Sequence, residues 1–227
     1  YSGLQPEKIY IWVAFLGAIG AGVASIADGY WLVWVGYSLI FGIANGLGYG
    51  FGLQLAARAN PNQAGLAMGV VTASYALGAV LAPYGFDVAL TYGGFFLAMA
   101  ALGSVVVVVS IGAAVLVARS GVKYTDTQAA RRVTHLPVGL IAMIWVAYGS
   151  GVAAGLMAIG HAAEIAATAG FAGWIAAATI AGFNLVGSLL SGWLSDRISH
   201  RHILTTLPVI GATALLALAV LPEQTLV

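Results

Sequence analysis

The sequence predicts an all-α, polytopic bundle of transmembrane helices, and three of its features support this fold class. Of its 227 residues, 61% are hydrophobic and only 7% are charged, whereas a soluble domain carries roughly a quarter charged residues. Apolar stretches of about 20 residues, the length that a helix needs to cross the hydrocarbon, recur along the whole chain. The basic residues fall between these stretches in a regular order. A chain with so few charges cannot cover a water-exposed surface, so most of its surface must face lipid.

About seven stretches are long and apolar enough to span a membrane, and they are expected to be helices because every backbone group must be hydrogen-bonded there. Turn-forming residues separate several of them: Asp28-Gly29, Asn60-Pro61-Asn62, Tyr92-Gly93-Gly94 and Thr134-His135-Leu136-Pro137. The predicted spans are residues 9–27, 31–57, 65–86, 93–118, 137–161, 171–194 and 203–221.

The positions of the charged residues support this division independently. If the N-terminal end lies in the cytoplasm, every Lys and Arg falls on the cytoplasmic side, and the outer loops and helix ends hold only acidic residues. This is the positive-inside pattern, and it predicts a multi-pass protein of the cell inner (cytoplasmic) membrane. The basic residues are Lys8, Arg58, Arg119, Lys123, Arg131, Arg132, Arg197 and Arg201, and the outer acidic residues are Asp28, Asp87, Glu164 and Glu223.

The longest polar stretch, residues 119–136, holds half of the Lys and Arg residues and divides the chain into two blocks. Residues 1–118 are predicted to form the end portion of an N-terminal helical bundle, with about four spans. Residues 137–227 are predicted to form the first portion of a C-terminal bundle, with about three spans. The stretch between them is either a short linker or a hinge between the bundles, and the motif described next favours the hinge.

The most specific segment is residues 192–201, which read Gly-Trp-Leu-Ser-Asp-Arg-Ile-Ser-His-Arg. Gly192 allows two helices to cross closely, and Asp196 can accept hydrogen bonds from backbone N–H groups at a helix start and pair with a cation. The segment resembles the signature loop of the major facilitator superfamily, in which Gly, Ser or Ala, Asp and Arg have this spacing. The resemblance implies that Gly192, Asp196, Arg197 and Arg201 form a cytoplasmic gating loop. A solvated helix cap is the alternative.

This loop departs from the family pattern at two positions, because Ser199 stands where Gly is usual and His200 where a basic residue is common. The family's loop occurs between helices two and three and between helices eight and nine. If the present loop joins helices eight and nine, the chain covers helices three to nine of a twelve-helix fold. It then lacks the first two and the last three helices.

Within the superfamily the chain is similar to the oxalate/formate antiporter branch and its monocarboxylate-transporter relatives. One departure concerns the substrate: anion carriers of this branch have an Arg shortly after the position of Asn184, where this chain has Ser188. No Lys or Arg lies within any predicted span, which argues against oxalate itself unless a cation on the helices that this chain lacks neutralises it. The similar segments are residues 46–50, 63–69, 78–83 and 155–161.

Polar residues inside predicted spans are the candidate site residues. We expect five of them to line a substrate pathway, with hydrogen bonding between helices as the alternative role: Asn45, Tyr49, Tyr75, Tyr148 and Asn184.

His161 and Glu164 are three residues apart on one predicted helix face, so they could couple transport to proton movement. A solvated outer cap is the alternative role for this pair. Met157 and His161 alone are too few ligands for a metal ion, so no metal site is expected.

These features predict a secondary active transporter of a small organic solute, such as a carboxylate, that works by alternating access. The alternative is a non-transporting, major-facilitator-like subunit that scaffolds or assembles a larger membrane complex. The expected partners are the lipid bilayer and a small-molecule solute, and other membrane subunits if the natural chain is this short. The sequence shows no nucleophile–base arrangement, phosphate-binding loop or basic stripe, so we expect neither an enzyme nor a cofactor, and no nucleic-acid partner.

Overall fold

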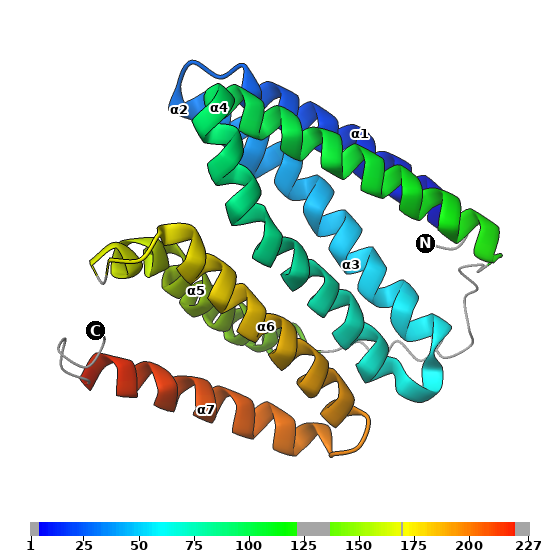
Figure 1. Cartoon of the computed structure of the whole chain (residues 1–227). Coiled ribbons are helices and arrows are strands. Elements are labelled where there is room, and N and C mark those ends of the chain that lie inside the picture. The colour runs from blue at the N-terminus through cyan, green and yellow to red at the C-terminus, as the bar shows by residue number, and fades with distance from the viewer. Residues whose placement is uncertain (1–4, 122–136, 169, 221–227) are drawn as a thin grey trace.

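The computed structural model describes residues 5–121, 137–168 and 170–220, and these residues form helices and no strand (Figure 1). The predicted all-α class is therefore confirmed. Most of the predicted loop 119–136 lies outside the described residues. The helical elements are α1 (Pro6–Ser25), α2 (Tyr30–Val33), η1 (Trp34–Phe41), α3 (Gly42–Ala59), η2 (Pro61–Gln63), α4 (Ala64–Ser120), α5 (Val138–Thr168), α6 (Gly173–Ser195) and α7 (His200–Val220).

The elements α2, η1 and α3 follow one another without a break, and η1 is a π-helix of eight residues. π-Helical segments are rare and usually a single turn long. Gly36 in η1 lies against α1: a Cβ atom there would be 2.6 Å from the Ala24 nitrogen and 2.8 Å from the Gly20 carbonyl oxygen. Glycine is required at this position because the two backbones touch.

The helix α4 consists of two arms that meet at Gly94, whose φ of 63° and ψ of −161° are not helical. Figure 1 shows the first arm running beside α3 and the second arm returning along α1. Only glycine adopts this combination of angles readily. The predicted break at residues 92–94 is therefore confirmed.

In the described part of the chain, five helical stretches are long and apolar enough to cross a membrane, by length and composition: Pro6–Ser25, Tyr30–Ala59, Pro61–Ser120, Val138–Ala162 and Gly173–Ser195. This number differs from the seven predicted spans for two reasons. The stretch Pro61–Ser120 contains two predicted spans joined at Gly94, and α7 contributes the shorter apolar stretch Arg201–Ala217. Helices of this length and composition are able to cross a membrane several times.

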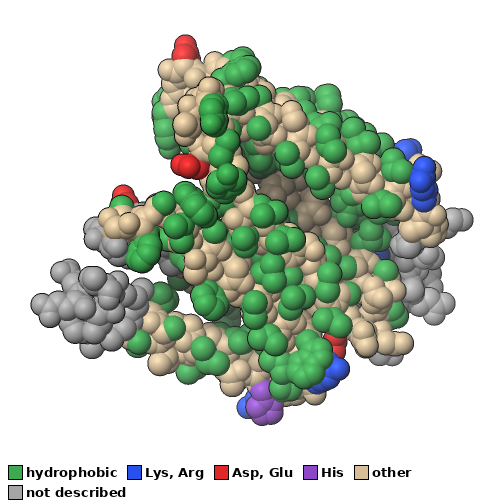
Figure 2. Space-filling model, viewed as in Figure 1, with side chains coloured by type: hydrophobic (Ala, Val, Ile, Leu, Met, Phe, Trp, Pro, Cys, Tyr) green, Lys and Arg blue, Asp and Glu red, His purple; other side chains and the backbone are tan. Residues whose placement is uncertain are grey.

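The helices pack mainly through small side chains. α1 contacts η1, α3 and α4, α3 contacts α4, and α6 contacts both α4 and α5. In lipid, helices associate through the close approach that Gly and Ala permit. Large apolar side chains spread over the face seen in Figure 2, whereas the charged side chains lie near helix ends, with the Lys and Arg side chains gathered at one end of the helices. The contact between α4 and α6 joins the two blocks of the sequence.

Candidate functional site: the crossing of α4 and α6

The helices α4 and α6 touch backbone to backbone at three glycines. A Cβ atom on Gly192 would lie 2.6 Å from the Gly65 carbonyl oxygen and 2.8 Å from the Gly69 Cα atom. A Cβ atom on Gly65 would in turn overlap the Ser195 hydroxyl, and it would lie 2.7 Å from the Gly192 carbonyl oxygen. Side chains at these positions would push the helices apart, so the three glycines set the depth of the crossing.

This close crossing brings the end of α6 to the start of α4, where Asp196 accepts two backbone hydrogen bonds. The Gly65 N–H donates to Oδ1 and the Leu66 N–H donates to Oδ2, each at 2.8 Å. Both amides lie in the first turn of α4, where N–H groups have no partner within the helix. The carboxylate therefore caps a helix that begins about 130 residues earlier in the chain.

The electrostatics of this cap are favourable. A carboxylate is stabilised by the partial positive charge at a helix start, and hydrogen bonds to an ionised acceptor are stronger than neutral ones. Each such bond contributes about 1.5 to 3 kcal/mol, and the lower value applies here because Asp196 is exposed. The two bonds together therefore contribute about 3 kcal/mol.

Arg197 does not pair with Asp196, although the sequence analysis allowed for a cation there. Its Nη1 donates to the Trp193 carbonyl oxygen at 3.2 Å, and the guanidinium carbon lies 4.0 Å from the centre of the Trp193 ring. This arrangement is a cation–π contact. Arg201 is exposed at the start of α7, and its side chain makes no hydrogen bond or ion pair in the described part of the chain. Of the predicted gating loop, Gly192 and Asp196 lie at the crossing.

A second contact joins α4 and α6 nearer the other end of the pair. The rings of Tyr84 and Trp174 meet edge to face, with 5.8 Å between their centres. The two helices are antiparallel, so residues 65–69 pair with residues 188–196 and Tyr84 pairs with Trp174. The α4–α6 contact therefore has a polar end at Asp196 and an aromatic end at Trp174.

Three of the predicted pathway residues come together between α3 and the first arm of α4. Asn45 Nδ2 donates to the Tyr75 hydroxyl at 3.2 Å, and the rings of Tyr49 and Tyr75 lie 5.1 Å apart between their centres. The Thr72 hydroxyl donates to the Met68 carbonyl oxygen, so Tyr49 donates to the Thr72 oxygen at 3.1 Å. We call Asn45, Tyr49, Thr72 and Tyr75 the tyrosine cluster.

The other two predicted pathway residues do not join the tyrosine cluster. Asn184 Oδ1 accepts from the Ser188 hydroxyl on its own helix at 3.1 Å. Tyr148 is 69% exposed on α5 and has no hydrogen bond or ring contact in the described residues. Within the tyrosine cluster, Asn45 and Tyr75 are exposed, Tyr75 to 53%, whereas Tyr49 and Thr72 are half-buried.

His161 and Glu164 lie on one helix, as predicted, because α5 continues to Thr168 beyond the predicted span 137–161. Alanines extend the helix here, and Ala162 and Ala166 are buried. The His161 Nδ1 atom is 3.4 Å from Glu164 Oε2, and the two side chains are 65% and 81% exposed. The two side chains therefore contact each other, and both are largely exposed.

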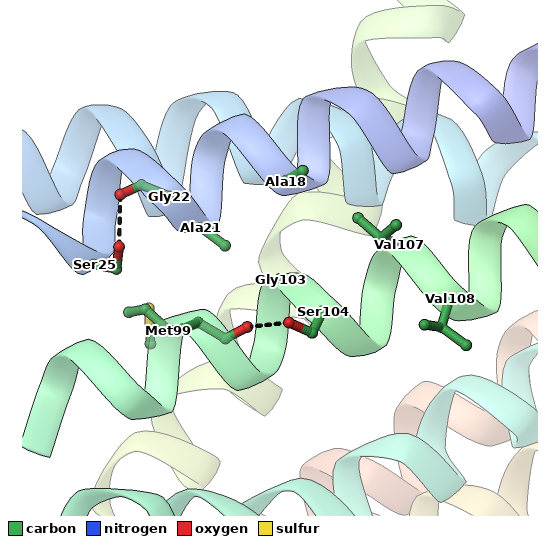
Figure 3. Close-up of a pocket in the computed structure, with 10 residues that line it drawn as sticks. Ala18, Ala21, Gly22, Ser25, Met99, Gly103, Ser104, Val107 and Val108 are labelled. Atoms are coloured by element: carbon green, nitrogen blue, oxygen red, sulfur yellow. Dashed lines mark hydrogen bonds between the residues drawn. The ribbon is translucent and has the colours of Figure 1, made fainter. Parts of the chain in front are cut away.

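A hollow of about 470 Å³ lies between α1 and the second arm of α4, away from all these residues (Figure 3). Figure 3 shows its two hydroxyl groups hydrogen-bonded to their own helices: Ser25 to the Gly22 carbonyl oxygen and Ser104 to the Ala100 carbonyl oxygen. Its lining contains no ionisable side chain. It therefore offers no free polar group that could select a solute.

Sequence reasoning missed the partners of the predicted residues. Gly65 and Gly69 are four apart, a small-xxx-small pattern, but similar patterns occur elsewhere in the chain and most face open space. Thr72 and Trp193 gave no signal, because an apolar span commonly includes either residue. Comparison with models of known families, with curated proteins and with solved structures finds no match to this chain.

Proposed function

We propose that this chain is part of a secondary active transporter of the major-facilitator type, which moves a small organic solute, such as a carboxylate, by alternating access. In this proposal the seven predicted spans cross the inner membrane with the N-terminal end of the segment in the cytoplasm. Residues 1–118 and 137–227 then belong to two bundles that move relative to each other.

The observation that carries the proposal is the bonding of Asp196 to the first turn of α4. Alternating access needs a contact between the bundles that holds one arrangement and releases in the other. Two hydrogen bonds that together contribute about 3 kcal/mol are suited to this, because a ligand shifts an equilibrium by its differential affinity, which is commonly a few kcal/mol. The Tyr84–Trp174 contact is the corresponding contact toward the other end.

The tyrosine cluster is the part of this transporter proposed to face the solute. It presents an amide, two phenol hydroxyls and two aromatic faces on adjacent helices. These groups suit a small solute that both accepts hydrogen bonds and packs against a ring. Asn184 and Tyr148 belong to this pathway only if the bundles bring them to the cluster in another arrangement.

The experiment is uptake by the intact gene product reconstituted in proteoliposomes, with labelled monocarboxylates and small neutral solutes, in the presence and absence of a proton gradient. Asp196→Asn should change the uptake rate, whereas Asp28→Asn, the same change at an exposed acidic residue in the turn between α1 and α2, should not. Absence of both uptake and solute binding would refute transport. Together with stoichiometric co-purification of other membrane proteins, that result would support the alternative of a non-transporting subunit.

A further inference from the structure

A groove of about 160 Å³ opens between α6 and α7, close to the loop that joins them. Leu194 and Ile198 line it on one side, and Ile203 and Leu207 line it on the other. Leu207 is 45% exposed and Ile198 is 43% exposed. The groove is therefore an apolar surface that opens toward the surroundings of the helices.

Two hydroxyl groups also line the groove, but both are already hydrogen-bonded. The Ser191 hydroxyl donates to the Ser188 carbonyl oxygen at 3.2 Å, and the Thr206 hydroxyl donates to the His202 carbonyl oxygen at 2.7 Å. Each hydroxyl thus donates its hydrogen bond to a carbonyl oxygen of its own helix. The walls of the groove consequently behave as apolar along their length.

Basic residues occur at the end of this groove that adjoins the loop between α6 and α7. His202 lines it, and Arg197 and Arg201 are the chain neighbours of the lining residues Ile198 and His202. Figure 2 shows Lys or Arg side chains and a His side chain gathered at this end of α6 and α7.

The nearby carboxylate forms no ion pair with these groups in the described part of the chain. Asp196 is bonded to the backbone of α4, and neither arginine forms an ion pair with a described residue. Arg197 gives one N–H to the Trp193 carbonyl oxygen, and a guanidinium carries five donors. The His202 ring uses Nδ1 toward the Ser199 hydroxyl at 2.6 Å, which leaves Nε2 for a ligand. The end of α6 and α7 that adjoins the groove therefore carries positive charge and spare donors.

We propose that this groove binds an anionic phospholipid. One acyl chain lies against Ile203 and Leu207, and the phosphate is held by Arg197, Arg201 and the His202 Nε2 atom. Basic pockets between membrane helices are suited to acidic headgroups, and Trp193 under Arg197 is typical of the headgroup level. The apolar groove suits the acyl chain of a lipid, and the neighbouring basic groups suit its phosphate.

The dimensions of the groove favour a lipid over a protein partner. A helix is about 10 Å across with its side chains, and a groove of about 160 Å³ holds only a slender chain. A lipid is present at high concentration wherever α6 and α7 cross a membrane. Lipid binding requires only that α6 and α7 lie in a membrane, and it is independent of whether the protein transports a solute.

The test is native mass spectrometry of the full-length protein in detergent, with phosphatidylglycerol and phosphatidylcholine that carry identical acyl chains. We expect phosphatidylglycerol to be retained preferentially. Arg197→Gln and Arg201→Gln should each weaken its binding by about fivefold. Arg119→Gln, at the exposed end of α4, is the matched control and should leave binding unchanged.

Two further experiments distinguish binding of a lipid from binding of a free phosphate. Thr206→Phe should weaken lipid binding by filling the groove without changing any charge, and soluble glycerol phosphate at the same concentration should fail to displace the lipid. Equal retention of the two lipids would overturn the proposal, as would equal losses in Arg119→Gln and Arg201→Gln. Displacement by glycerol phosphate would also overturn it, because the site would then recognise phosphate alone. Gel filtration of each variant identifies any that is misfolded, and Thr206→Phe supplies an independent test if an arginine variant fails.

Discussion

Replacing Gly192 with alanine should separate α4 from α6 and release Asp196 in the same step. The new Cβ atom would lie 2.6 Å from the Gly65 carbonyl oxygen and 2.8 Å from the Gly69 Cα atom. Non-bonded carbon contacts are favourable at about 3.5 to 4.0 Å, so the helices must move apart by about 1 Å. Both neighbours are backbone atoms, which cannot rotate out of the way as a side chain can.

That movement is enough to break both hydrogen bonds of the carboxylate. Each is 2.8 Å long, and a separation greater by about 1 Å exceeds the range of an N–H···O bond. The loss is about 3 kcal/mol, which is a change of roughly 100-fold in the population of the crossed arrangement. The matched control is Gly182→Ala on the same helix, because a Cβ atom at Gly182 would meet nothing within 4 Å.

The assay is the distance between spin labels on Asn62→Cys and Ser199→Cys, two exposed positions that flank the crossing. These 227 residues contain no cysteine, so no native thiol in them has to be removed. Gly192→Ala should broaden and lengthen the distance distribution, and Gly182→Ala should leave it unchanged. If the two variants behave alike, the glycine contact does not set the crossing.

Combining Asp196→Ala with Gly192→Ala tests whether both changes act on the same contact. Asp196→Ala removes the hydrogen bonds without adding a Cβ atom to the interface, so alone it should lower stability by about 3 kcal/mol. Added to Gly192→Ala, it should have little further effect, because the bonds are already broken. Full additivity of the two changes, measured by unfolding in detergent, would show that Asp196 acts independently of the crossing.

Two other variants test the bend and the tyrosine cluster. Gly94→Ala should destabilise the protein by about 1 to 3 kcal/mol, because an L-residue is strained at this backbone conformation. The control is Gly112→Ala on the same helix, where a new Cβ atom would meet nothing within 4 Å. This control should keep or slightly raise the melting temperature in detergent. Tyr75→Phe removes the hydroxyl that accepts from Asn45 and should lower stability by only about 0.6 kcal/mol, the average for hydrogen bonds between membrane helices. A large fall in solute uptake with so small a change in melting temperature would assign Tyr75 to the pathway, and equal small changes in both would assign it to helix packing.

Much of the fold could be predicted because lipid leaves few choices. A backbone in hydrocarbon must be helical, so apolar length and turn residues alone placed most helices, and the Gly94 break followed from adjacent glycines at residues 93–94. The predicted span 137–161 agrees with the apolar stretch Val138–Ala162, and alanines extend α5 beyond it to Thr168. The π-helix Trp34–Phe41 gave no signal in the sequence, and neither did the backbone contact of its Gly36 with α1.

The candidate site was predictable in its chemistry but not in its partners. The spacing of Gly192 and Asp196 indicated a close crossing and a carboxylate that caps a helix start, but nothing in the sequence identifies that start as Gly65 and Leu66. For the tyrosine cluster, the sequence gives the depth of a residue along a helix but not its rotation about the axis. The predicted set therefore mixed residues that meet, such as Asn45 and Tyr75, with Tyr148, which does not meet them.

The choice of a helix start, instead of an arginine, as the partner of Asp196 has a mechanical consequence. An arginine side chain is long and flexible, so its ion pair with a carboxylate can persist while two helices drift apart. Backbone amides are fixed to the helix, so the bonds of Asp196 to Gly65 and Leu66 lengthen together with any separation of α4 and α6. The glycine contact and the two bonds are thus either all present or all lost. In the proposed transporter, a contact with these two states is the bistable element that a switch between arrangements requires. Arg197 takes no part in this contact, because its guanidinium lies over the Trp193 ring.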